Sequence, residues 1–178
     1  MAFTAQDVKT LREMPSVGMM DCKKALQATA GDMDAAIDWL REMGLAKAAK
    51  KADRSAAEGG AYATVIDGVG VVIEVISETD FAAKTDAFID LVKNLAIVGA
   101  KENPADVEAL KASKYPNSNL TVTEIMQEKV MSIGENMVIR RFDRFAENVS
   151  VAYVHAGGTH GVLVNLAVEG DIDATEIG

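Results

Sequence analysis

The apolar residues of this chain repeat with two different periods, and the change between them constrains the fold more than any other feature. Up to residue 44 they recur every three or four positions, as on one face of a helix. From residue 61 they fall in short strand-like runs, and Asp67-Gly68 separates the first two runs as in a β-hairpin. Helical segments return further along the chain. The sequence therefore predicts an α+β protein: an N-terminal helical bundle, then an α+β core of antiparallel hairpins and packed helices.

The first 45 residues predict three short helices. Thr4 can cap the first helix, with Asp7 three residues later as its capping-box partner. Asp32 can cap the third helix, which is expected to end at Gly44. Three helices of this length bury only a small core. Residues 1–45 are therefore expected to form a three-helix mini-domain.

The rest of the chain divides into three predicted segments. Residues 46–60 interleave Lys and Arg with alanines, and Gly59-Gly60 closes the stretch, as in a solvated, partly helical basic linker. Residues 61–136 are expected to form a first core subdomain. Residues 137–178 contain strand patterns and are expected to form a partial second core subdomain.

Helices and strands are both expected after the first hairpin. The helices are predicted at about 81–100, directly after Pro104, and at about 121–133, and the strands at 137–145, 149–155 and 160–168. The first of these helices should bury Phe88, Leu91, Val92, Leu95 and Val98. The last strand is apolar on both faces, and such a strand needs cover on both. Either another chain covers it, as in a homodimer, or further sequence does.

Composition excludes several classes of function. The 178-residue chain has a formal net charge of −9, which disfavours direct binding to nucleic acid and favours a protein partner. Its single cysteine, Cys22, excludes an internal disulfide and a cysteine-rich metal cluster, and fits a reducing compartment. The first residues lack the pattern of a signal peptide, and the dense apolar runs are too short to span a bilayer. We therefore expect a cytoplasmic protein without a membrane partner.

Motifs for catalysis and cofactor binding are missing from the sequence. It has no G-x-x-x-x-G-K-[ST] loop, no G-x-G-x-x-G fingerprint, no H-E-x-x-H and no G-x-S-x-G. Glu78 and Asp80 could be read as an acid–base pair, but two carboxylates at a helix start are more simply explained by the helix dipole. The sequence therefore predicts no enzyme activity, no cofactor and no metal site.

The segment Glu78-Thr79-Asp80-Phe81 has two interpretations. Thr79 or Asp80 is expected to be the N-cap of the following helix. From spacing alone, Phe81 is expected to pack into its own core as a hydrophobic staple. The alternative is an exposed aromatic that contacts a partner, because such residues dominate interface energetics.

Five ordered segments of the chain resemble the signature segments of the elongation factor Ts family. They are Leu11-Arg12-Glu13, Gly18 to Leu26, Ala48-Ala49-Lys50-Lys51-Ala52, Glu78 to Lys84, and Ile133-Gly134-Glu135-Asn136. Together they extend over essentially the whole chain. The chain differs from the family at Pro15-Ser16-Val17, where Thr-Gly-Ala is usual, and Pro15 is also expected to end the first helix.

The resemblance implies a guanine-nucleotide exchange factor that promotes GDP release from the GTPase elongation factor Tu. It implies that the GTPase is contacted by Arg12, Met19, Met20, Lys23, Thr79, Asp80, Phe81 and His155. In the family, Asp80 and Phe81 would insert near the magnesium site of the GTPase, while the N-terminal helices dock on its nucleotide-binding domain. The family also continues beyond the region that this chain matches.

A second interpretation is a non-catalytic interaction module. The N-terminal bundle also resembles ubiquitin-associated domains, whose methionine-containing loop binds partner proteins. From the residues alone, Met19 and Met20 could equally pack in the core, and Lys23 could lie on a solvated face.

Overall fold

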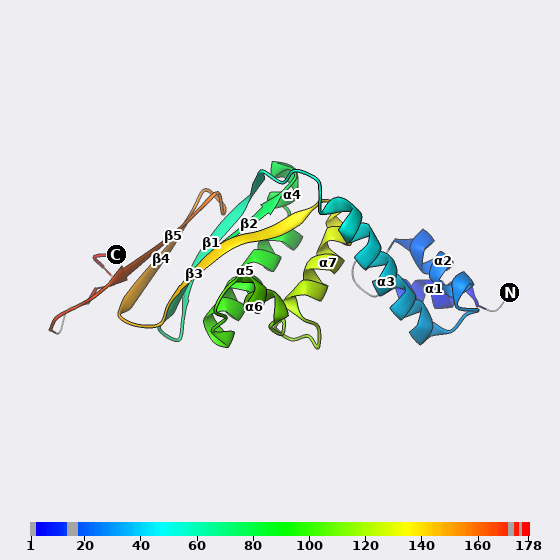
Figure 1. Ribbon diagram of the computed structural model, residues 1–178, viewed down its shortest axis with the longest axis horizontal. Coiled ribbons are helices and arrows are strands. Elements are labelled where there is room, and N and C mark those ends of the chain that lie inside the picture. The colour runs from blue at the N-terminus through cyan, green and yellow to red at the C-terminus, as the bar shows by residue number, and fades with distance from the viewer. Residues whose placement is uncertain (1–2, 14–17, 171–172, 175) are drawn as a thin grey trace. The chain divides into compact units, whose positions relative to one another are not determined.

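The computed structural model describes residues 3–13, 18–170, 173–174 and 176–178 (Figure 1). Its helices and antiparallel strands confirm the predicted α+β class. The chain divides into two compact units, which we name the helical unit (Met1–Arg54 with Met126–Gly134) and the sheet unit (Ser55–Ile125 with Glu135–Gly178). Pro15, with its neighbours Ser16 and Val17, lies outside the described residues.

The helical unit begins with three helices. They are α1 (Ala5–Arg12), α2 (Met19–Ala28) and α3 (Met33–Lys51). Thr4 and Asp7 form the predicted capping box, in which the Asp7 carboxylate accepts from the Thr4 N–H at 2.6 Å. Asp32 caps α3 as predicted, because its Oδ1 accepts from the Ala35 N–H at 3.0 Å.

One small apolar cluster holds these three helices together. Its buried members are Leu11, Cys22, Ala25, Leu26, Ala36 and Leu40. Phe3, Val8, Met33, Ile37 and Trp39 pack around them and are partly buried. All three helices contribute, so the packed faces are those that the helical period marked in the sequence.

The prediction that the third helix ends at Gly44 is wrong, since α3 continues to Lys51. Gly44 is buried, and a Cβ at this position would collide with Sδ of Met131. Met131 belongs to α7 (Val122–Ile133), whose C-terminal part lies in the helical unit. A glycine inside a helix is about 1 kcal/mol less favourable than alanine, and a close approach by a neighbour is a common reason to keep it.

The sheet unit contains a three-stranded antiparallel sheet in the order β1-β2-β3. Its strands are β1 (Glu58–Ile66), β2 (Val69–Ser77) and β3 (Met137–Phe145). Asp67 and Gly68 form the predicted hairpin turn between β1 and β2, with φ angles of 51° and 81°. Two consecutive positive φ angles match the twist of the flanking strands.

Strand β1 starts earlier in the chain than its alternating pattern predicts. Gly59 and Gly60 were expected to close a linker, but both pair with β2. Gly59 has φ +145°, and a Cβ there would collide with the backbone carbonyl of Val75. The glycine therefore permits a close approach of two backbones within the sheet.

The single helix predicted at 81–100 is two helices, α4 (Asp80–Ala83) and α5 (Asp86–Glu102). Thr85 separates them, because its hydroxyl donates to the Ala82 carbonyl at 2.8 Å and accepts from the Phe88 N–H at 3.3 Å. The same side chain therefore hydrogen-bonds a carbonyl at the end of α4 and caps the start of α5. The helix predicted directly after Pro104 begins later, as α6 (Val107–Ala112), and is capped by Asp106.

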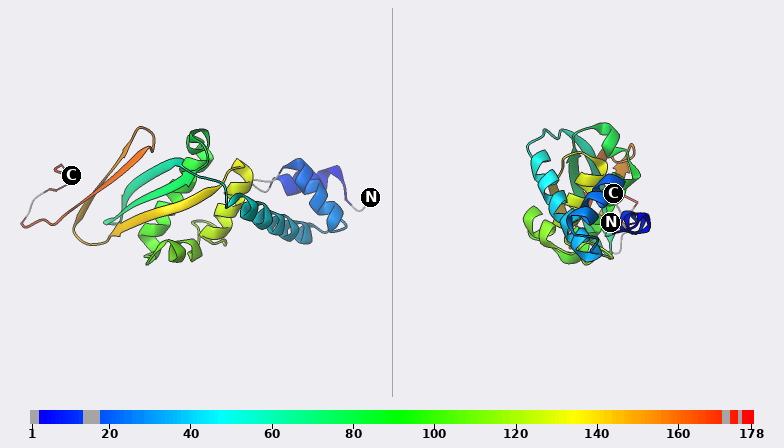
Figure 2. Two further views of the ribbon diagram at one scale, coloured as in Figure 1. Left: turned by 45° about the horizontal axis from the view of Figure 1, so that its top comes forward. Right: turned by 90° about the vertical axis from the view of Figure 1, so that its right-hand side faces the viewer.

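Helices and a second hairpin cover opposite faces of the sheet (Figures 1 and 2). Helix α5 packs on one face with its predicted stripe buried: Phe88, Leu91, Val92, Leu95 and Val98. The hairpin of β4 (Val149–His155) and β5 (His160–Leu166) lies against the other face. There the Ala61 N–H donates to the Gly158 carbonyl at 2.7 Å. Strand β5 ends before the predicted Val168.

Candidate partner-binding site

The turn between β2 and α5 presents the residues that the sequence singled out. Thr79 has an extended backbone and is the N-cap of the one-turn helix α4. Its hydroxyl accepts from the Ala82 N–H at 3.2 Å, while Ala82 itself is buried. Of the two predicted caps, Thr79 or Asp80, the structure selects Thr79, because a cap needs an extended backbone one residue before the helix.

Phe81 projects into solvent and is 79% exposed. The interpretation of Phe81 as a hydrophobic staple is therefore wrong. A staple residue precedes the N-cap and packs against the fourth helical residue, whereas Phe81 follows the N-cap Thr79 and lies inside α4. An aromatic ring with this exposure is available for contact with another molecule.

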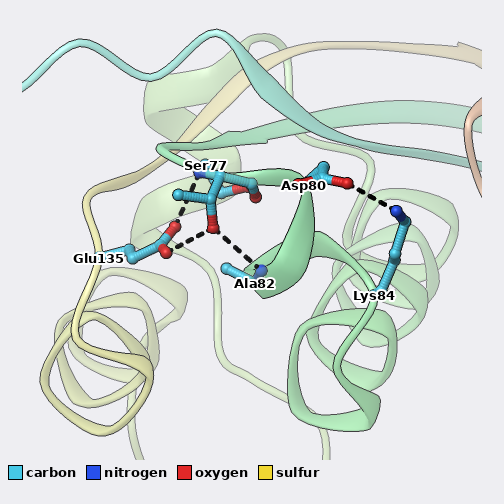
Figure 3. Close-up of polar contacts among 6 residues, drawn as sticks. Ser77, Asp80, Ala82, Lys84 and Glu135 are labelled. Atoms are coloured by element: carbon cyan, nitrogen blue, oxygen red, sulfur yellow. Dashed lines mark hydrogen bonds and ion pairs between the residues drawn. The ribbon is translucent and has the colours of Figure 1, made fainter.

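Asp80 points outward beside Phe81 and forms an ion pair with Lys84 (Figure 3). The distance from Asp80 Oδ2 to Lys84 Nζ is 2.6 Å. The hydrogen bond from Lys84 holds the pKa of the Asp80 carboxyl below its usual value. Asp80 therefore stays ionised under ordinary conditions.

Glu135 holds the start of α4 from the turn before β3 (Figure 3). Its Oε2 accepts from the Thr79 N–H at 3.0 Å, and its Oε1 accepts from the Thr79 hydroxyl at 2.6 Å. The hydroxyl of the buried Ser77 donates to the Thr79 carbonyl at 3.0 Å. These three hydrogen bonds therefore fix both the backbone and the side chain of Thr79.

Glu78 and Asp80 have different partners, which argues against an acid–base pair. Glu78 Oε1 accepts from the Asn136 N–H at 2.6 Å, whereas Asp80 accepts from Lys84. Neither contact supplies a nucleophile or an electrophile. Within the described residues, no group of three or more His, Cys, Asp or Glu side chains could hold a metal ion.

A second set of singled-out residues lies in the helical unit, at the start of α2. Met19 and Met20 are 55% and 63% exposed, so the alternative that they pack in the core is wrong. Lys23 is also exposed, and its spacing of three and four residues places it beside both methionines on the helix surface. These three residues form a mixed apolar and basic surface.

Arg12 and Cys22 show how α1 approaches this region within the helical unit. Arg12 is exposed in the last turn of α1. Burial raises the pKa of the Cys22 thiol, and the Arg12 guanidinium acts weakly in the opposite direction. Leu11, the chain neighbour of Arg12, packs with Cys22 of α2 in the apolar cluster of the helical unit.

His155 is exposed at the end of β4 in the sheet unit. Its Nδ1 lies 3.0 Å from the Tyr153 hydroxyl, and its ring centroid lies 6.0 Å from that of His160 across the hairpin. Tyr153 is exposed as well. The three rings form a polar aromatic surface that the sequence analysis, which considered His155 alone, did not identify.

Glu135 was also missed as a site residue by the sequence analysis. It lies in the segment Ile133-Gly134-Glu135-Asn136, whose resemblance to the family was the only available signal. Its contact with Thr79 spans a sequence separation of 56 residues. No local pattern predicts such a contact.

No helix in the described part of the chain is long and apolar enough to cross a membrane.

Comparisons with known proteins agree on one family. The family model described as elongation factor TS matches residues 78–177. Elongation factor Ts of Magnetococcus marinus is 45% identical over 178 residues, covering 99% of this chain and 59% of the relative. That of Bartonella tribocorum is 47% identical over 181 residues, with 98% and 59% covered, and that of Methylocella silvestris is 48% identical over 177 residues, with 96% and 57% covered.

The chain thus spans less than two thirds of the length of these relatives. The family match includes the whole of α4, Glu135, and the β4–β5 hairpin. The alignments with relatives extend the similarity to nearly the full chain. Because the family model covers more than half of the sequence and the long alignments agree with it, this chain belongs to the elongation factor Ts family.

Proposed function

We propose that this chain is a translation elongation factor that acts as a guanine-nucleotide exchange factor and promotes GDP release from elongation factor Tu. The observation that carries the proposal is the exposed Phe81 on a helix start that is fixed by Glu135. A rigidly presented aromatic side chain is suited to entering a pocket on a partner. Membership of the elongation factor Ts family supports elongation factor Tu as that partner.

The exchange itself follows from thermodynamic linkage and needs no bond chemistry. A factor that binds the nucleotide-free GTPase better than the GDP-bound form weakens GDP binding by the same ratio. Reversing a hundredfold preference takes about 5.5 kcal/mol of differential binding. Burial of the Phe81 ring supplies only about 1.5–3 kcal/mol, so other contacts must supply the rest.

The helical unit offers the additional docking surface. The exposed Met19 and Met20 provide flexible apolar contact area, and Lys23 adds a positive charge beside them. In the sheet unit, His155 with Tyr153 provides a further exposed contact. We propose that these surfaces supply affinity while Phe81 supplies the change in nucleotide binding.

Asp80 adds an ionised carboxylate next to the Phe81 ring. The magnesium ion that accompanies GDP in a GTPase requires nearly ideal octahedral geometry with few protein ligands. A ring and a carboxylate that enter near those ligands would displace them and lower the affinity for the diphosphate. The nucleotide pool, and not the factor, sets the direction of exchange.

The proposal is tested with elongation factor Tu loaded with a fluorescent GDP analogue. The 178-residue chain should accelerate release of the analogue into excess unlabelled GDP. It should also bind the nucleotide-free GTPase more tightly than the GDP-bound form. An unchanged release rate together with equal binding to both forms would contradict the proposal.

The exposed methionines favour one second candidate, a ubiquitin-binding module in the helical unit. Titration of the chain with ubiquitin separates the two functions. Saturable binding to ubiquitin with nucleotide-insensitive binding to elongation factor Tu would support the interaction module instead.

A further inference from the structure

We propose that Glu135 is a positioning residue for Phe81: it fixes the N-cap of α4 and so sets the direction in which the ring is presented. The inference rests on the exchange function proposed above and adds a residue that acts through another. Its structural basis is the contact between the Glu135 carboxylate and Thr79, with hydrogen bonds of 2.6 and 3.0 Å.

Helix α4 has only four residues, so it cannot be stable through its own hydrogen bonds. Its start depends on the Thr79 hydroxyl, which accepts from the Ala82 N–H at 3.2 Å. The same hydroxyl donates its single proton to Glu135 Oε1. Glu135 therefore fixes the rotamer in which Thr79 can cap the helix.

A second contact joins the same two turns, the one before α4 and the one before β3. The Asn136 N–H donates to Glu78 Oε1 at 2.6 Å, so each turn places a glutamate on the backbone of the other. Asn136 is buried at 6% exposure. Charge-assisted hydrogen bonds of this kind are about twice as strong as neutral ones, and burial strengthens them further.

The side chains of Phe81 and Asp80 take no part in this partly buried network. Asp80 pairs with Lys84 (Figure 3). Phe81 has most of its surface in solvent. No hydrogen bond joins the Glu135 side chain to either residue among the contacts of the described chain. Any effect of Glu135 on presentation of the ring therefore passes through Thr79.

The test uses the isosteric variant Glu135→Gln, which keeps the shape but places an amide group where the N–H or the hydroxyl of Thr79 needs an acceptor. Release of a fluorescent GDP analogue from elongation factor Tu is measured over a range of factor concentrations. The maximal release rate should fall about tenfold, while the half-saturating concentration changes less than about twofold, since loss of a charged hydrogen bond has effects of at least this size. Glu108→Ala removes an exposed carboxylate that pairs with Lys111 at 2.7 Å, and should leave both values unchanged.

Three further variants separate positioning from a general loss of stability. Thr79→Ser keeps the hydroxyl and should retain at least about half of the maximal rate, whereas Thr79→Val should lose as much as Glu135→Gln. In a Phe81→Ala background, Glu135→Gln should cause no additional loss, because its effect passes through the ring. A full additional loss in that background would overturn the proposal.

A measurement that does not depend on exchange completes the test. The ¹H–¹⁵N heteronuclear NOE of the Phe81 amide should fall in Glu135→Gln and stay unchanged in Glu108→Ala. If the wild-type chain does not accelerate GDP release at all, the exchange function fails, and this measurement still decides the role of Glu135. An unchanged NOE at Phe81 in Glu135→Gln would overturn the positioning role.

Discussion

The carboxylate of Asp80, the first residue of α4, lies 2.6 Å from the ammonium group of Lys84, the C-cap residue four positions later. This ion pair keeps a negative charge next to the Phe81 ring. Both partners are substantially exposed, so the pair contributes little to the stability of the fold. Its effect is on the ionisation and direction of the Asp80 side chain.

Removal of the positive charge should raise the pKa of Asp80. The pKa of this carboxyl in the folded protein is lowered, chiefly by the hydrogen bond from Lys84. The Asp80–Lys84 ion pair therefore stabilises the folded state above the ordinary carboxyl pKa, and this stabilisation is lost as the pH falls through the lower, folded-state pKa. Carboxyl ¹³C shifts followed during an acid titration should show a higher midpoint for Asp80 in Lys84→Gln than in the wild type. Lys111→Gln, at the other exposed pair, should leave the Asp80 midpoint unchanged.

Phe81→Ala should slow GDP release while leaving the fold intact. The ring is 79% exposed, so its removal creates no cavity and should shift the thermal midpoint by about 2 °C or less. The maximal release rate should fall at least about tenfold, because burial of the ring is worth about 1.5–3 kcal/mol. Phe145→Ala removes another exposed aromatic of the sheet unit and serves as the control. Equal release rates for wild type and Phe81→Ala would refute the assigned role of the ring.

Replacement of both Met19 and Met20 by Ala should weaken docking and leave the maximal release rate nearly unchanged. These side chains are exposed, and their loss removes apolar contact area from the helical unit only. The half-saturating concentration should rise about tenfold, which corresponds to about 1.4 kcal/mol. Leu45→Ala, at an exposed leucine of α3, is the matched control. A fall in maximal rate without a change in half-saturation would reverse the roles proposed for the two units.

The close approach of Gly44 and Met131 predicts a coupling between two substitutions. Gly44→Ala should stabilise a free helix by about 1 kcal/mol. In this chain the gain should be smaller or absent, because the new Cβ meets Sδ of Met131. In a Met131→Ala background, Gly44→Ala should recover a gain of about 1 kcal/mol in urea unfolding. Equal effects in both backgrounds would show that the methionine adapts without cost.

Much of the local structure could be predicted from the sequence because it depends on neighbouring residues. The capping box of Thr4 and Asp7 and the turn at Asp67-Gly68 are set by a few adjacent side chains and φ angles. The buried stripe of α5 follows from the helical period. The break at Thr85 was missed, since its hydroxyl serves two helix ends and sequence alone does not show which residue does so.

The α+β class, most helices and strands, and the segment that contains Thr79 and Phe81 follow from the amino-acid pattern alone. Three features become visible only in the folded chain: Phe81 is exposed, α3 continues through Gly44, and Glu135 holds Thr79. All three have one cause. Each outcome depends on which distant side chain or open space lies beside the residue, and the period and propensity of a local segment contain no information about that neighbour.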